Sequence, residues 1–100
     1  MNRPSNLNNY FTKVMDKLAE RLPDCADNPL LLAAYAQLVL TTGRKTTLEN
    51  VHDAWSAWRV NSDRPGHPDI VWFDELAPEV QEYDNMYREG IIAVAKEMGR

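Results

Sequence analysis

The sequence predicts an all-α fold, a compact domain of four helices with a short extended segment at residues 70–73 before the last helix. Apolar side chains recur at the 3.6-residue period of amphipathic helices in four separate segments. Capping residues, prolines and glycines stand where these segments begin or end. Because 100 residues leave room for one hydrophobic core, we expect a single domain over 1–100, with a helical pair in 1–45 and a second unit in 46–100.

The first two helices are expected at about 5–22 and 28–42. In the first, Leu7, Phe11, Val14 and Leu18 share one face, and Pro23 ends the helix. The second begins with an Asn-Pro pair at residues 28–29, a favourable N-cap and first turn. Nearly all of its side chains are apolar, which predicts that other helices surround it and that it forms the centre of the core.

The third helix is expected to start at Thr46, whose spacing to Glu49 fits a capping box, and to fade near Val60. Its apolar stripe consists of Leu48, Val51, Trp55 and Trp58.

Residues 61–71 are rich in turn formers and predict a loop. The apolar stretch at 70–73 is expected to be extended and to cover the core. The last helix should start near Pro78, with Gly99 as its stop. Gly90, inside this helix, predicts a close approach by another backbone because glycine costs about 1 kcal/mol there relative to alanine. One face of this helix carries Val80, Tyr83, Tyr87, Ile91, Val94 and Met98.

The formal net charge of −4 argues against a nucleic-acid partner, which would require a basic face. The charge is uneven, since residues 1–50 carry 6 Lys/Arg and 5 Asp/Glu whereas residues 51–100 carry 5 and 10. An acidic half is typical of a solvated face, and it can also attract a basic partner.

Cysteine usage and hydropathy favour a cytoplasmic protein, in a bacterium or an infected host cell. Cys25 is the single cysteine, which excludes an internal disulfide and fits a reducing compartment. No apolar run approaches the roughly 20 residues that span a bilayer, so we expect no membrane association. The first six residues lack the apolar stretch of a signal peptide.

No pattern in the sequence indicates an enzyme. There is no nucleophile elbow, no Gly-rich phosphate loop and no dinucleotide fingerprint. Cys25 lies between Asp24 and Asp27, whose negative charge disfavours a thiolate. Carboxylates such as Asp74 and Glu75 are better explained as helix caps and solvated charges than as an acid–base pair.

A metal site or other cofactor is not expected either. His52 and His67 are the two histidines, and Asp53, Asp63 and Asp69 lie near them in the chain. Their spacing matches no known ligand pattern, and no second cysteine is available. We expect His52 to pack on its helix and His67 to hydrogen-bond backbone in the loop.

The aromatic residues of the second half are the more informative set. Most of them should fill the core, since a small domain needs large side chains there. Trp55 and Trp58 are three residues apart on one helix face, and one of them is expected to be partly exposed. A partly exposed indole beside Trp72 would offer a stacking site for a flat ligand or an anchor for a protein. The set is Trp55, Trp58, Trp72, Phe73, Tyr83 and Tyr87.

The second half resembles the ryanodine-receptor-type (RyR) repeat domain. The residues that carry the resemblance are Val51-His52-Asp53-Ala54-Trp55, the run from His67-Pro68 to Leu76, and Glu82-Tyr83-Asp84. The family pattern has a helix with His-x-x-Trp, a His-Pro segment ending in Leu, and a closing acidic helix. The layout is also similar to small proteins of actinobacterial phages. The match covers about half of the chain, and the first 45 residues lie outside it.

The resemblance implies a non-catalytic module, with candidate binding residues His52, Trp55, His67, Trp72, Phe73, Tyr83 and Asp84. An alternative is that His67, Pro68, Phe73 and Leu76 merely hold the loop on the closing helix.

Three positions depart from the family pattern. Trp72 replaces a Pro, Gln81 a Lys, and Asn85 an Arg. The last two remove a basic pair, which weakens a nucleotide-binding interpretation because phosphate would then need backbone amides.

The leading hypothesis is therefore a non-enzymatic binding or adaptor protein, phage- or prophage-encoded, that acts on a host protein. Acidic charge around an aromatic-rimmed surface within 52–87 would steer a basic partner. The alternative is a sensor or sponge for a nucleotide-like small molecule, held in a groove near Trp55 and Trp72. A homodimer is a further possibility.

Overall fold

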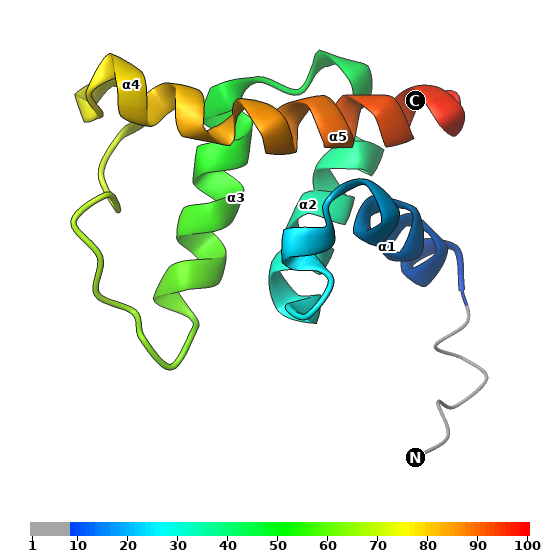
Figure 1. Cartoon of the computed structure of the whole chain (residues 1–100), viewed down its shortest axis with the longest axis horizontal. Helices are drawn as coiled ribbons and strands as arrows, with labels where there is room; N and C mark the ends of the chain where they lie inside the picture. Colours follow the sequence, from blue (N-terminus) through cyan, green and yellow to red (C-terminus); the bar gives the residue numbers. More distant parts are fainter. Residues whose placement is uncertain (1–8) are drawn as a thin grey trace.

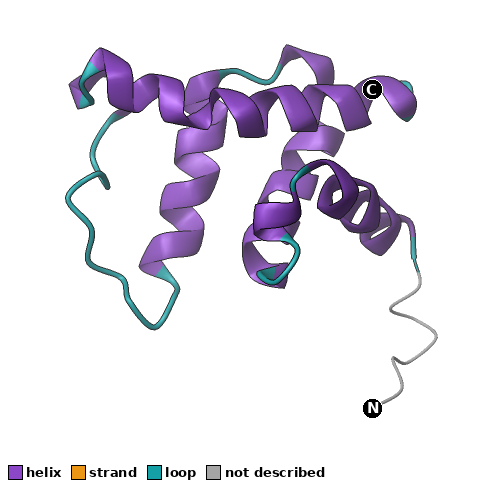
Figure 2. Ribbon diagram, in the orientation of Figure 1, coloured by secondary structure: helices purple, strands orange, loops and turns teal. Residues whose placement is uncertain are grey.

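The computed structural model describes residues 9–100 as a helical protein, which confirms the predicted all-α class. Four helical segments are present, and the last is built from α4, a 3-10 turn and α5 in succession (Figures 1 and 2). No strand occurs in this part of the chain. The α-helices are α1 Tyr10–Arg21, α2 Pro29–Thr41, α3 Leu48–Val60, α4 Pro78–Gln81 and α5 Asn85–Glu97. The 3-10 turns are η2 Pro23–Cys25, η3 Gly43–Lys45, η4 Phe73–Glu75 and η5 Glu82–Asp84.

The N-terminal helix begins later than the sequence predicts. Asn9 caps α1, and its Oδ1 accepts hydrogen bonds from the backbone N–H groups of Phe11 (2.9 Å) and Thr12 (3.0 Å). The expected helical residues 5–8, including Leu7, lie outside the described residues.

The core forms where α1, α2 and α5 meet, with Val51 added from α3. Figure 1 shows α5 lying across one end of α2 and α3. As predicted, α2 is central, since it contacts α1, α3 and α5. Its first turn is open, where Leu30 is 70% exposed, and Gln37 and Thr41 are also exposed. The buried cluster is Val14, Leu18, Leu22, Cys25, Leu32, Tyr35, Ala36, Val39, Val51, Ile91, Val94 and Ala95.

The predicted cap of α3 is wrong by one residue. Thr47, rather than Thr46, forms the capping box, with Asn50 as its partner: the Asn50 N–H donates to Thr47 Oγ1 at 3.1 Å, and the Thr47 N–H donates to Asn50 Oδ1 at 2.9 Å. The buried Thr46 hydroxyl instead donates to the Gly43 carbonyl at 2.6 Å. The Thr46 side chain is therefore occupied in the η3 turn, and Thr47 caps α3 in its place.

The expectation that residues 70–73 cover the core is also wrong. The segment runs over the surface: Ile70 is half-buried, while Val71 and Trp72 are exposed. Phe73 already belongs to η4. Within the described residues no helix is long and apolar enough to span a membrane.

Gly90 is buried in α5, but the group that approaches it is a side chain and not the backbone that the sequence suggested. A Cβ atom at this position would lie 2.8 Å from Leu22 Cδ2 and 3.0 Å from its Cγ. Glycine here lets the Leu22 side chain pack directly against the α5 backbone.

We expect Gly90→Ala to lower the free energy of unfolding in urea. The gain in helix propensity of about 1 kcal/mol is outweighed by overpacking against Leu22, which costs about 1–3 kcal/mol. In the Leu22→Ala background the same substitution should become neutral or stabilising. Gly66→Ala is the control, because nothing lies within 4 Å of that position. Equal effects of Gly90→Ala in both backgrounds would contradict this packing account.

Candidate functional site

Five of the seven predicted binding residues line one cavity between α3, the loop after it, and α4 with η5. The cavity has a volume of about 180 Å3. Three lining residues were not among the predicted ones: Asp69, Leu76 and Val80. The five predicted residues are His52, Trp55, His67, Tyr83 and Asp84.

His52 attaches the loop to α3. Its side chain is 3% exposed, and Nε2 lies 2.7 Å from the Val71 carbonyl oxygen. Since a carbonyl oxygen only accepts hydrogen bonds, Nε2 carries a hydrogen and donates it. In the neutral ring Nδ1 is then an acceptor, and no described residue donates to it.

Stacked and edge-on rings build one wall of the cavity. The rings of His52 and Trp55 stack with their centroids 5.9 Å apart and an angle of 25° between their planes. His67 meets Trp55 edge-on at 5.0 Å and 87°. Phe73 packs against His52 at 6.1 Å, although it does not line this cavity. These contacts place each of the four rings against at least one other ring.

The loop residues His67 and Asp69 form a local turn. His67 Nδ1 accepts a hydrogen bond from the Asp69 backbone N–H at 3.0 Å. The turn leaves the Asp69 carboxylate at the cavity, and among the described residues this carboxylate has no hydrogen-bond or ion-pair partner. Asp69 was not among the predicted binding residues. Its position two residues after His67 is the sequence feature that could have identified it.

Asp84 supplies a second carboxylate, from the 3-10 turn before α5. Desolvation raises the pKa of Asp84 above 3.8, the negative charge of Asp69 raises it further, and His52 lowers it. Its side chain does not cap α5. Asp84 therefore contributes negative charge to a half-buried site whose described lining residues include no lysine or arginine.

Trp72 lies outside this cavity, so the predicted groove near Trp55 and Trp72 does not exist. Its side chain is 77% exposed and borders an open hollow of about 510 Å3. The separation follows from α3, since Asp53 and Ser56 line the hollow of Trp72 whereas His52 and Trp55 line the cavity. Residues 52 and 53 point about 100° apart around a helix.

The backbone around Trp72 is held at several points. The Gln81 side-chain amide donates to the carbonyl oxygens of Phe73 (3.0 Å) and Leu76 (3.2 Å). The Glu75 N–H donates to the Trp72 carbonyl at 2.9 Å. Together with the bond from His52 to Val71, these contacts fix the chain on both sides of the exposed indole.

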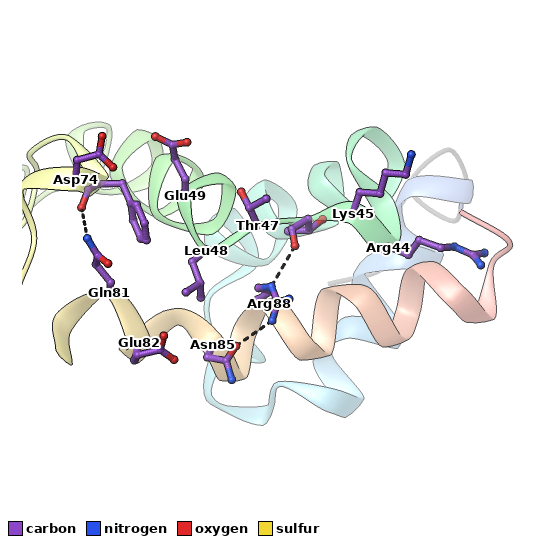
Figure 3. Close-up of a pocket in the computed structure, with 12 residues that line it drawn as sticks. Arg44, Lys45, Thr47, Leu48, Glu49, Asp74, Gln81, Glu82, Asn85 and Arg88 are labelled. Atoms are coloured by element: carbon purple, nitrogen blue, oxygen red, sulfur yellow. Dashed lines mark hydrogen bonds between the residues drawn. The ribbon is translucent and has the colours of Figure 1, made fainter. Parts of the chain in front are cut away.

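A wider polar groove of about 670 Å3 lies between the start of α3 and the α4–α5 segment. Figure 3 shows Arg44 and Lys45 at one end of it, Asp74 and Glu82 at the other, and Arg88 between them. The Arg88 guanidinium is engaged, because Nε donates to the Thr46 carbonyl (3.2 Å) and Nη1 to Asn85 Oδ1 (3.0 Å). The sequence analysis did not predict this groove. The adjacent basic residues Arg44 and Lys45 are the sequence feature that could have indicated it.

The titratable groups of the described residues do not converge into a metal-binding cluster. In residues 9–100 no group of three or more His, Cys, Asp and Glu is placed to hold a metal ion. Cys25 is buried, and burial, reinforced by Asp24, raises its pKa. What the arrangement offers is a small acidic cavity with aromatic walls beside an exposed indole.

We expect Asp84→Asn to stabilise the protein at pH 7, because the folded state holds this carboxyl at a raised pKa. The folded wild type binds this proton more tightly than the unfolded chain. The stability that the protonated Asp84 carboxyl contributes is therefore fully present below pH 3.8, and it is lost as the pH rises through the pKa of Asp84 in the folded state. Urea unfolding across this range should show a gap between variant and wild type that opens as the pH rises.

The difference in stability between Asp84→Asn and its parent should be smaller in the Asp69→Asn background. That background removes the repulsion between the two carboxylates but leaves Asp84 desolvated. A wild type that is more stable than Asp84→Asn at pH 7 would contradict this assignment.

Comparison with known proteins identifies a family but no function. Residues 9–96 match a family described as a domain of unknown function, DUF7701. No curated protein and no solved structure matches the chain. The family description does not mention the RyR-type repeat, so the expectations from that resemblance stay predictions. Because the match extends over nearly all of the described residues, the chain belongs to the DUF7701 family.

Proposed function

We propose that this protein is a non-enzymatic binding module that holds a basic protein partner through Trp72. The observation that carries the proposal is an indole 77% exposed on a segment whose backbone is fixed. Tryptophan is the residue type most enriched among those that dominate binding energy at protein interfaces. An exposed tryptophan on an anchored loop is suited to insert into an apolar pocket of a partner.

Preorganisation strengthens this interpretation. A loop that must be ordered on binding loses part of its interaction energy to conformational entropy. Here the buried His52 imidazole and the Gln81 amide hold the flanking carbonyls before any partner arrives. Both histidines of the chain are engaged by loop backbone, which favours a structural role over acid–base chemistry.

The charges near Trp72 indicate the partner's chemistry. Asp53 and Glu75 line the same hollow as the indole, and Asp74 lies between Glu75 and Phe73 in η4. Their charge would steer a basic surface towards the indole. A second copy of this chain fits less well, because a two-fold contact would bring identical acidic patches together.

The alternative of a nucleotide-like ligand has less support. A pocket for a small molecule of that kind usually exceeds about 300 Å3 and is lined by aromatic residues. The aromatic cavity has about 180 Å3, whereas the groove of about 670 Å3 has Phe73 as its one aromatic residue. Phage or prophage origin, and a host protein as the target, stay predictions.

We expect Trp72→Ala to weaken capture of the partner from a bacterial lysate by at least about 30-fold in Kd. Loss of a central tryptophan typically costs about 2 kcal/mol or more of binding free energy. Tyr10→Ala is the matched control, since Tyr10 is an exposed aromatic on α1 that lines none of these cavities. It should leave binding unchanged. Quantitative pull-down followed by calorimetry with the identified protein measures both effects.

Two further results separate recognition from misfolding. Trp72→Ala should keep the wild-type free energy of unfolding within about 0.5 kcal/mol, because the side chain is largely exposed. Raising the ionic strength from about 0.1 M to about 1 M should weaken binding to a basic partner. Binding that survives Trp72→Ala, or that requires Tyr10 equally, would refute the proposal.

A further inference from the structure

The cavity next to Trp72 has the chemistry of a cation site. Two carboxylates, Asp69 and Asp84, line it, and within residues 9–100 no lysine or arginine does. Neither carboxylate has an ion-pair or hydrogen-bond partner in the described chain. This acidic, half-enclosed space therefore has no lysine or arginine side chain as an internal counter-ion among the described residues.

Aromatic rings supply the remaining walls. Trp55 is half-buried and fixed between the rings of His52 and His67, and Tyr83, 69% exposed, belongs to the lining. The face of an aromatic ring attracts a cation, most strongly when the ring is tryptophan. Rings and carboxylates thus favour the same class of ligand.

A third, independent observation is the free acceptor of His52. This side chain is nine-tenths buried and lines the cavity, yet Nδ1 receives no hydrogen bond from the described residues. Nδ1 in the neutral ring accepts, because Nε2 donates to Val71. An N–H group of a ligand in the cavity could donate to this nitrogen, which is not among the sealed, unpaired atoms of the described chain.

We infer that this cavity binds an organic cation, an alkylammonium or guanidinium group, against the Trp55 ring and the carboxylates of Asp69 and Asp84. A metal ion fits less well, since no three potential ligands converge in the described chain. The volume of about 180 Å3 is suited to the end of a side chain rather than to a whole metabolite. The inference deepens the proposed function. It rests on that function where the cation is a Lys or Arg side chain of the partner that binds Trp72.

The test uses the isolated chain and small cations. Amide and indole 1H–15N spectra are recorded during titration with N-acetyl-lysine methylamide, N-acetyl-arginine methylamide and spermidine. N-acetyl-norleucine methylamide is the neutral control of similar shape. We expect saturable shifts of the Trp55 indole and of the amides of His67, Asp69 and Asp84 with the cations, and none with norleucine.

Variants assign the site. Asp84→Asn and Asp69→Asn should each weaken cation binding roughly tenfold or more, as expected for loss of a charge-assisted contact. Asp27→Asn is the control with the same change in charge; Asp27 is exposed and lines none of these cavities, so affinity should change less than about twofold. Asp69→Asn and Trp55→Phe, with their unfolding curves, test the site independently of Asp84.

The outcomes distinguish the source of the cation and separate this inference from the proposed function. Tighter binding of the lysine or arginine derivative supports a partner side chain, and tighter binding of spermidine supports a free polyamine. Shifts that norleucine reproduces, or that both Asn variants leave unchanged, overturn the cation site even if Trp72 still binds a partner. If Trp72→Ala leaves partner binding unchanged while the cavity still binds the cations, the proposed function is refuted and the cation site stands.

Discussion

The hydrogen bond between the buried His52 imidazole and the Val71 carbonyl is the contact on which the arrangement of the second half depends. It joins α3 to a loop that contributes nothing to the buried cluster. Without it, a buried imidazole would lose its partner, which typically costs about 1–3 kcal/mol. The same ring forms a wall of the acidic cavity, and its partner Val71 directly precedes the exposed Trp72, so one side chain positions both candidate binding features.

The core explains why aromatic surface is left for this purpose. Aliphatic residues from α1, α2 and α5, with Tyr35 as the one aromatic member, fill the interior. None of the three tryptophans is needed there: Trp55 and Trp58 are half-buried, and Trp72 is exposed. The buried cluster therefore forms without the indoles, and the placement of Trp55 and Trp72 reflects loop contacts rather than core packing.

The sequence predicted the helices well because their signals are local. Period, caps and prolines lie within a few residues of one another, and even the misplaced cap of α3 was wrong by one position. It also grouped five of the cavity residues through the family resemblance. The exposure of Trp72 could not be predicted, because apolar character in 70–73 fits a buried or an open segment equally. Gln81 and Asp69 were missed since their roles depend on which backbone groups the fold brings near them.

The order of the Trp72 segment tests the central claim most directly. 15N relaxation should give order parameters near 0.85, typical of rigid backbone, for residues 70–76 of the wild type. In His52→Leu, which keeps an apolar side chain but removes the donor, the values at 70–72 should fall towards 0.6 or below while those of α2 stay unchanged. A segment that is already mobile in the wild type, or equally rigid in the variant, would contradict the account.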